Sequence, residues 1–223
     1  MKKILVSLVF VLLLGVVASA QTAMEKTLMA MEKQAWDAFG KGDGKFFETF
    51  LVDEAMIGGD NGFLSRTEDG GHTWVKQVIQ TTSAINDIYF RDKEAGFLIA
   101  GNAIFTTRDN GVRWTEARRF SPSEFNGADV ELYSVRFSSK KKGWVVGSVS
   151  RHESVIDSIL LFTDDAGETW QRQRAPSRLE LIHVDFANDK RGWITGANGT
   201  ILATVDAGAV QWSEVVNGRQ VRG

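Results

Sequence analysis

The octapeptide TDDAGETW, residues 163–170, sets two adjacent acids, Asp164 and Asp165, a few positions ahead of Trp170. Paired carboxylates can carry general acid–base catalysis, because each can give or take a proton at a substrate. Asp and Gly are also the residues that tight turns require. The pattern of the rest of the chain decides between the two readings.

The octapeptide belongs to a repeat. TEDGGHTW (67–74) and TRDNGVRW (107–114) share Thr, Asp, Gly and Trp with it in register, and TVDAGAVQW (204–212) has one residue inserted before its Trp. The Asp at the third position of each copy lies 40, 56 and 41 residues after the same Asp of the copy before it. Such a spacing is typical of a repeat architecture. The repeated residues are Asp69, Gly71, Trp74, Asp109, Gly111, Trp114, Asp165, Gly167, Trp170, Asp206, Gly208 and Trp212.

The repeated motif has the composition of a structural turn. An Asp side chain can accept hydrogen bonds from turn N–H groups, and a Gly can take a positive φ angle. The Trp that follows can bury a large ring. Four copies of one acid argue for scaffolding, because an active site needs its acid only once. We therefore predict that these motifs are structural.

A second motif travels with the first. Phe90, Phe137 and Phe186 are each followed six residues later by a Gly and then by Phe or Trp. Short segments of alternating hydrophobicity predict strands. The last unit predicts four of them, at 181–186, 192–196, 200–205 and 211–216. Tandem four-stranded units are propeller blades, so we predict an all-β fold, a β-propeller or propeller arc of about four four-stranded blades.

These motifs resemble the Asp box, or bacterial neuraminidase repeat, of sialidases, sortilin-type receptors and the photosystem II stability and assembly factor family. The pairing of F-x-D-x-x-x-G-[FW] with T-x-D-x-G-x-T-W is most similar to the assembly-factor branch and covers residues 55–216. The resemblance implies a non-catalytic binding or assembly module. A sialidase-like carbohydrate-active enzyme or carbohydrate-binding propeller stays open as the alternative. It would use a Tyr with a Glu partner, whereas Tyr89 and Tyr133 lie in alternating strand segments and are predicted as core residues.

The chain divides into four predicted parts. Residues 1–20 join Lys2 and Lys3 to an apolar run and the small residues ASA, which indicates a cleaved signal peptide and an exported, periplasmic or secreted protein. An uncleaved signal is the alternative and would be the one link to a membrane. Residues 21–52 predict a helical segment, whose sequence is weakly similar to the start of SnoaL-like cone proteins. The repeat domain follows at 53–217, and 218–223 form a tail.

The sequence gives little support for metal, nucleotide or nucleic-acid binding. The chain has no cysteine, and His72, His152 and His183 lack the close spacing of a metal pair. There is no phosphate-binding loop or dinucleotide fingerprint in the sequence. A net charge of -2 gives no general attraction to nucleic acid. We expect no cofactor, no metal and no nucleic-acid partner.

Two insertions interrupt the repeat, RRFSPSEFNGADVE after residue 117 and VSRHESVID after residue 148. Connections alternate between the two ends of an up-and-down blade, so both insertions should project opposite the Asp boxes, while SSKKKG at 138–143 should lie with the boxes. Loops on a rigid scaffold concentrate binding residues. We predict a protein or glycan partner at the insertions, with guanidinium groups clamping carboxylates and aromatic rings giving apolar area. The candidate residues are Arg118, Arg119, Phe120, Phe125, Arg151 and His152.

The first unit lacks a first strand, because the helical segment stands in its place. A strand from 215–223 could close the ring. Otherwise the arc stays open, and its edges invite self-association or cover by the helical segment. A truncated gene product that needs a second chain is a third possibility.

Overall fold

The computed structural model describes residues 29–30, 33–34, 37, 53–207, 212–216 and 219–221. The described part from residue 53 onward consists of antiparallel strands joined by turns, loops and three 3-10 helices, η1 (Asp60–Gly62), η2 (Pro122–Phe125) and η3 (Ala197–Gly199). The chain separates into two compact units, one formed by 1–57 with 65–76 and the other by 58–64 with 77–223. In the described part, no helix is long and apolar enough to cross a membrane.

The first sheet contains three strands, β1 (Ala55–Gly58), β2 (Leu64–Thr67) and β3 (Val75–Lys76), in that order. β2 is buried at all four of its positions. Among the described residues, this sheet has no strand in the place that the first strand of a blade would take.

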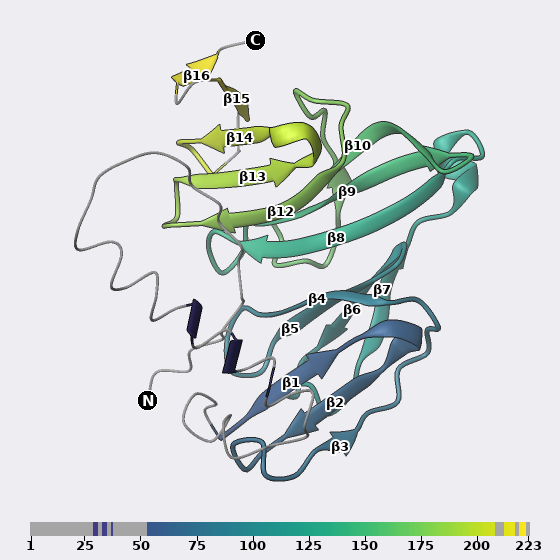
Figure 1. Ribbon diagram of the computed structural model, residues 1–223, viewed down its shortest axis with the longest axis vertical. Helices are drawn as coiled ribbons and strands as arrows, with labels where there is room; N and C mark the ends of the chain where they lie inside the picture. The colour runs from purple at the N-terminus through teal and green to yellow at the C-terminus, as the bar shows by residue number, and fades with distance from the viewer. Residues whose placement is uncertain are drawn as a thin grey trace. The chain divides into compact units, whose positions relative to one another are not determined.

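The larger unit contains three further sheets, which Figure 1 shows stacked in chain order with the β8 sheet between the other two. We call them the second, third and last blades. Their strands are β4 (Ile85–Phe90), β5 (Gly96–Ala100), β6 (Ala103–Thr107) and β7 (Thr115–Arg119); β8 (Asp129–Phe137), β9 (Gly143–Arg151), β10 (Ser154–Thr163) and β11 (Gln171–Arg172); and β12 (Leu181–Phe186), β13 (Gly192–Gly196), β14 (Ile201–Thr204), β15 (Ser213–Val216) and β16 (Arg219–Val221).

The second motif explains how the first two strands of each blade fit together. Gly96, Gly143 and Gly192 face the rings of Phe90, Phe137 and Phe186 across the strand pair. A Cβ atom at these glycines would come within 2.5 to 2.8 Å of the ring carbons. The Phe–Gly spacing is therefore a packing requirement, because only hydrogen fits beneath the ring.

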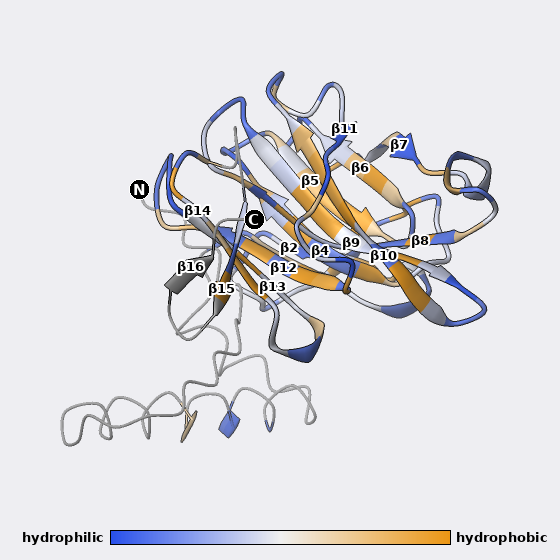
Figure 2. Cartoon of the chain, turned by 90° about the horizontal axis from the view of Figure 1, so that it is seen from above, coloured by the Kyte–Doolittle hydropathy of each residue, from blue (hydrophilic) through white to orange (hydrophobic). Residues whose placement is uncertain are grey.

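Neighbouring blades pack face to face through apolar side chains. Figure 2 shows the hydrophobic residues of the strands in orange. One cluster joins the second blade to the third and includes Phe97, Ile104 and Val135. Another joins the third to the last and includes Trp144, Leu181 and Trp212. The two central strands of the third blade, β9 and β10, are buried on both faces over most of their length for this reason.

The last blade ends differently from the predicted boundaries. Its first four strands lie within one or two residues of the predicted ones. Residues expected to form a tail include β16, which pairs with β15 of the same sheet, Val215 lying opposite Gln220. The predicted signal peptide lies outside the described residues. The predicted helical segment does too, apart from five helical positions, at 29–30, 33–34 and 37.

Candidate binding site at the loop end of the blades

The Asp boxes form the turns between the third and fourth strands, and we call this the box end. In the third blade, Thr163 Oγ1 donates to Asp165 Oδ1 at 2.7 Å. The carboxylate also accepts the Thr169 backbone N–H at 2.9 Å and the Thr169 hydroxyl at 2.6 Å. These hydrogen bonds lower the pKa of Asp165 to about 2, the Thr163 hydroxyl contributing most. Asp69 repeats the arrangement, with its pKa also lowered to about 2, chiefly by the Thr73 hydroxyl.

In the second, third and last blades, the box also contacts the turn between the first two strands of its own blade. Ala166 N–H donates to Lys141 O at 2.9 Å, and Asn110 N–H donates to Glu94 O at 3.0 Å. The predicted placing of the 138–143 turn with the boxes is therefore confirmed. Ala166 has a φ of +69°, so the box holds a non-glycine residue in the left-handed region immediately before Gly167.

The box Trp rings meet the Phe rings of the second motif. Trp114 and Phe90, Trp170 and Phe137, and Trp212 and Phe186 make edge contacts with ring centroids 5.9 to 6.0 Å apart. Such pairs add stability beyond the area that they bury. The Trp of the first motif and the Phe of the second motif thus pack against each other at the box end of the second, third and last blades.

A cleft of about 540 Å³ opens at the box end between the second and third blades. Its lining includes Arg91, Phe97 and Glu94, and the exposed ion pair of Arg108 with Glu168 joins the two blades beside it. Arg91 is already bound to Asp92 and donates to Ala166 O at 3.0 Å. Its guanidinium group therefore tethers the neighbouring box.

The two insertions meet at the opposite end of the blades, which we call the loop end. One insertion forms η2 (Pro122–Phe125) between β7 and β8, and the other lengthens the β9–β10 hairpin. Arg151 Nη2 donates to Asn126 O at 2.8 Å, which joins the hairpin to the residue that ends η2. The predicted meeting of the two insertions is therefore confirmed.

Two arginines of the loop end, Arg118 and Arg119, already have acidic partners. Arg118 pairs with Glu124, whose pKa is lowered chiefly by the Ser121 backbone N–H that its carboxylate accepts. Arg119 Nε donates to Glu116 at 3.1 Å, and its Nη1 donates to Asn102 at 2.9 Å. A carboxylate from a partner would have to share these guanidinium groups with the protein's own acids.

The expectation that Phe120 and Phe125 present apolar area is wrong. They are 5% and 9% exposed and belong to the core cluster beneath the loop. Their rings make an edge contact with centroids 6.3 Å apart, and the guanidinium groups of Arg118 and Arg172 lie over them. The insertion thus folds back on its own aromatic residues, which hold η2 in place.

The exposed apolar area lies instead at the tip of the β9–β10 hairpin. Val155 and Ile156 are 42% and 44% exposed. The register shifts between Val155 and Asp157, so Ile156 occupies a bulge, a feature that re-aims side chains. Sequence reasoning missed both residues, although the alternation of the strand breaks at VID and could have marked them.

The turn between the two strands carries backbone strain. His152 and Glu153 have φ angles of 49° and 64°, and Asn and Gly are the usual residues for such a pair of positions. Strained backbone of this kind concentrates at functional sites. The exposed side chain of His152 remains a candidate for partner contact.

A polar cluster lies on the first strands of the three larger blades. Arg136 and Asp87 form a largely buried ion pair at 2.6 Å, and Asp87 also accepts the Val135 backbone N–H. His183 Nδ1 lies 3.3 Å from Ser134 Oγ, and burial lowers the pKa of this His.

The predicted core tyrosines are half-buried in these first strands. Tyr133 donates to Glu180 at 2.7 Å, and burial raises its pKa to about 12. Tyr89 OH lies 3.5 Å from Phe137 O, and burial raises its pKa as well. Both hydroxyl groups thus connect neighbouring blades.

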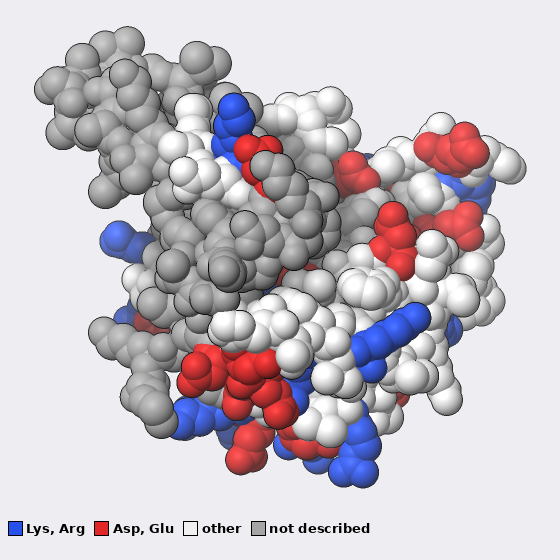
Figure 3. Space-filling model, turned by 60° about the horizontal axis from the view of Figure 1, so that its bottom comes forward, with Lys and Arg blue, Asp and Glu red and all other residues white. Residues whose placement is uncertain are grey.

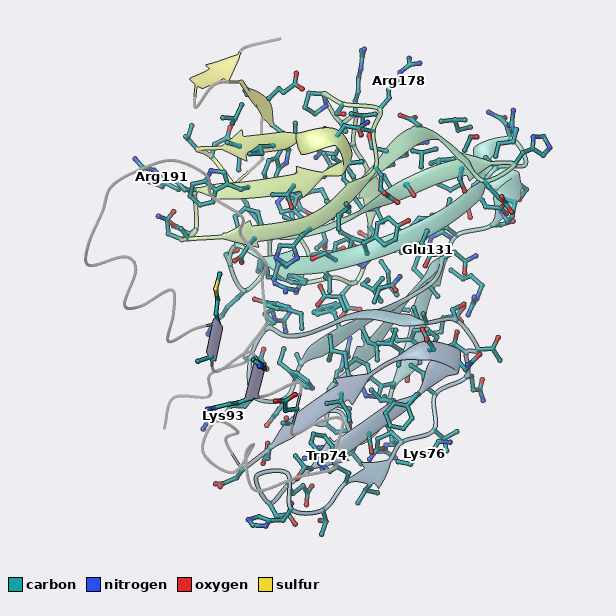
Figure 4. All side chains as sticks on the ribbon, in the orientation of Figure 1. Trp74, Lys76, Lys93, Glu131, Arg178 and Arg191 are labelled. Carbon is teal, nitrogen blue, oxygen red and sulfur yellow. The ribbon has the colours of Figure 1, made fainter. Side chains whose placement is uncertain are left out.

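Acidic and basic side chains are interspersed on the face shown in Figure 3. In Figure 4, Lys93 and Arg191 lie at the box end of the second and last blades, away from the loop end. Within the described ranges, no group of three or more His, Asp or Glu side chains is placed to hold a metal ion.

Comparison with known proteins identifies relatives of the repeats. Residues 72–180 match the family model described as photosynthesis system II assembly factor YCF48. The chain is 33% identical over 89 residues to the chloroplastic photosystem II stability/assembly factor HCF136 of Arabidopsis thaliana, a match that spans 38% of this chain and 19% of that protein.

Solved structures show the same fold. YCF48 bound to a D1 peptide superposes with a TM-score of 0.50 and 20% identity, over 75% of this chain and 44% of that one. The GH74 xyloglucanase from Xanthomonas campestris superposes with a TM-score of 0.57 and 15% identity, over 77% and 30%. A GH74 enzyme from Niastella koreensis gives 0.57 and 14%, over 73% and 27%. These likenesses confirm the predicted propeller blades, and the chain spans less than half the length of each relative.

Proposed function

We propose that this Asp-box propeller, whose repeats are similar to those of the photosystem II assembly factor family, is an exported, non-catalytic module that binds a protein partner at the loop end. One observation carries the proposal. Two separate insertions converge there through the Arg151–Asn126 hydrogen bond and hold Val155 and Ile156 exposed beside a strained turn. Exposed apolar side chains on a braced hairpin suit protein recognition.

The relatives support a protein as the partner. A structure of YCF48 holds a D1 peptide, and the curated relative is a stability and assembly factor. Arg118, Arg119 and Arg151 would give the partner charge-assisted hydrogen bonds around the apolar pair. Because Arg118 and Arg119 are already paired, we expect them to set orientation more than affinity.

Photo-crosslinking tests where the partner binds. A photoreactive phenylalanine analogue replaces Ile156 in one variant and Val112, an exposed apolar residue of a box turn, in the other. Both variants are expressed in the native host and irradiated. We expect a discrete protein adduct from position 156 and none from position 112. An adduct from position 112 alone would move the binding site to the box end.

Substitutions then measure what the arginines contribute. With the crosslinked partner in hand, a variant with Arg118, Arg119 and Arg151 changed to Ala should lose at least about 2 kcal/mol of affinity. Neutralising Lys140, Lys141 and Lys142 at the box end should change mainly the salt dependence of binding. The reverse pattern would contradict the proposal.

Activity assays test the catalytic alternative. Enzymes among the structural neighbours are GH74 proteins, and one of them is a xyloglucanase. We expect no turnover of xyloglucan, sialosides or aryl glycosides. Turnover that disappears when a single acid is changed would overturn the non-catalytic assignment.

A further inference from the structure

Asparagine is one of the chemically labile residues of proteins, above all where glycine follows it. The backbone nitrogen of the glycine can attack Cγ of the asparagine, which closes a five-membered succinimide ring and releases ammonia. Water then opens the ring at either carbonyl and leaves aspartate or isoaspartate. A left-handed backbone turns the glycine nitrogen away from the asparagine Cβ, so the peptide unit between the two residues must rotate before the ring can close.

The described part of the chain contains Asn–Gly pairs that share one backbone conformation. Their asparagines all have left-handed backbones, with φ between 55° and 58°. The pairs are Asn61–Gly62, Asn110–Gly111, Asn126–Gly127 and Asn198–Gly199. Another pair, at 217–218, lies outside the described residues. Any difference in reactivity between the described pairs must therefore come mainly from their surroundings.

Hydrogen bonds hold the glycine N–H group in two of these pairs. Gly62 N–H donates to Ser83 O at 3.0 Å. Gly111 N–H donates to Thr107 Oγ1 at 3.0 Å, within an Asp box. Rotation of either peptide unit would break this bond and leave its acceptor without a partner.

The pair in the loop after η2 is held at both ends of its peptide unit. Gly127 N–H donates to Pro122 O at 2.8 Å. The Asn126 carbonyl accepts a hydrogen bond from Arg151 Nη2, also at 2.8 Å. This peptide unit can rotate only if both hydrogen bonds break.

The peptide unit between Asn198 and Gly199 has no such restraint. Within the part of the chain that the structure describes, neither its carbonyl nor its N–H has a hydrogen-bond partner outside its own turn. Both residues are exposed. No atom lies within 4 Å of the position that a Cβ would take at Gly199. Nothing in the described surroundings therefore opposes rotation of this unit.

The turns η1 and η3 show that packing makes the difference. They have the same geometry, in which the residue after the glycine donates its N–H to the carbonyl of the first turn residue, at 3.0 Å in η1 and 3.1 Å in η3. A Cβ at Gly62 would lie 2.2 Å from Thr81 O, whereas the space around Gly199 is open. The same turn is thus packed against its neighbours at one site and free at the other.

We propose that Asn198 is a site of spontaneous deamidation, at which aspartate and isoaspartate accumulate as the folded protein ages. Its turn joins the second and third strands of the last blade, as the β9–β10 hairpin does in the third, so the new carboxylate stands at the loop end. Ala197 N–H donates to Glu180 O at 2.9 Å, which ties this turn to the residue that accepts the Tyr133 hydroxyl. Each modified chain therefore gains one negative charge near Glu180, whatever partner the loop end binds.

Peptide mapping by mass spectrometry tests the proposal on the purified full-length protein. The protein is kept folded in warm, mildly alkaline buffer, which favours loss of the proton from the attacking nitrogen. We expect Asn198 to be converted roughly tenfold faster than the other described Asn–Gly asparagines, because each of those must first break a hydrogen bond. Isoaspartate, measured with an isoaspartyl methyltransferase, should appear at the same site and mark the succinimide route.

Two controls separate the fold from the sequence. In urea the four asparagines should react at similar rates, because glycine follows each of them. Arg151→Ala releases the Asn126 carbonyl and should speed conversion at Asn126 while leaving the rate at Asn198 unchanged. Similar rates at all four sites in the folded protein, or faster conversion at Asn61 than at Asn198, would overturn the proposal. An Asn198 that reacts in urea but stays intact in the folded protein would overturn it as well.

Discussion

The box end and the loop end of the blades are made from the same strands but follow different rules. At the box end, three blades repeat one geometry, in which a Thr hydroxyl donates to the box Asp and a Trp ring meets a Phe ring. At the loop end, the connections differ in length, and one hairpin tip exposes Val155 and Ile156. The repeated residues are thus those that every blade needs in order to fold. The insertions that interrupt the repeat are the places where this chain departs from the common blade.

The largest expected difference between the two ends comes from two glycines with positive φ. Gly167 of the box has a φ of +90°, and a Cβ there would lie 2.4 Å from the Phe97 ring of the neighbouring blade. Gly127 of the loop has a φ of +79° with nothing within 4 Å of such an atom. Gly127→Ala should cost about 1 to 2 kcal/mol, the strain of the left-handed backbone alone. Gly167→Ala adds overpacking and should cost about 2 to 5 kcal/mol.

Urea unfolding of the two glycine variants measures this difference. The free energy of unfolding should fall more for Gly167→Ala than for Gly127→Ala, with the same denaturant dependence. Equal losses of unfolding free energy would mean that the neighbouring blades can move apart at Gly167 without an energetic cost, which would contradict a scaffolding role of the box.

A smaller difference should separate two aspartates of the third blade. Asp165→Ala removes the acceptor for Thr163 and Thr169 and should destabilise the protein by about 1 to 3 kcal/mol. Asp157 at the loop end forms an exposed ion pair with Arg172, so Asp157→Ala should cost no more than about 1 kcal/mol. Folded Asp165→Ala should still bind the partner. Loss of binding at an unchanged melting temperature would give the box a functional role.

The sequence was sufficient to predict the box end, because its determinants are local. Asp165, Gly167 and Trp170 lie within six residues of one another, and the Phe137–Gly143 spacing follows from the packing of one strand pair. Repetition then turned a weak motif into a fold prediction. The meeting of the two insertions also followed from topology, since connections alternate between the ends of an up-and-down blade.

The side-chain directions at the loop end could not be predicted in the same way. Phe120 and Phe125 were expected to be exposed because they lie in an insertion, but the capping of η2 by Ser121 turns both rings into the core. The exposed pair at 155 and 156 depends on a single bulge in the register. A bulge is set by the fit between two strands, and the equivalent strand pairs of the second and last blades, β5 with β6 and β13 with β14, have no such shift that could reveal it.

Relief of backbone strain should affect partner binding at the loop end but not at the box end. Ala166→Gly removes a left-handed alanine from the box and should stabilise the protein by about 0.5 to 1 kcal/mol while leaving partner affinity unchanged. Changing His152 to Asn and Glu153 to Gly should stabilise the hairpin by a similar amount, since those residues suit the turn. We expect this second variant to bind the partner less well, as measured by titration. Unchanged affinity would show that the turn only supports the hairpin.

The smallest expected effect is a change of stability with pH. It should distinguish the Asp boxes from the first strands of the blades. The box carboxylate of Asp165 has a pKa lowered from 3.8 to about 2, so its contribution to stability is complete above 3.8 and is lost as the pH falls toward 2. Burial lowers the pKa of His183 below 6.5, so the unfolded chain takes up this proton first and stability declines as the pH falls below 6.5. Mild acid should therefore weaken the contact of His183 with Ser134 while the boxes remain intact.

His183→Asn should flatten the dependence of the melting temperature on pH just below 6.5, and Asp165→Asn should leave that part of the curve unchanged. If Asp165→Asn flattened this part of the curve and His183→Asn did not, the boxes, and not the first strands, would be the acid-sensitive part of the blades.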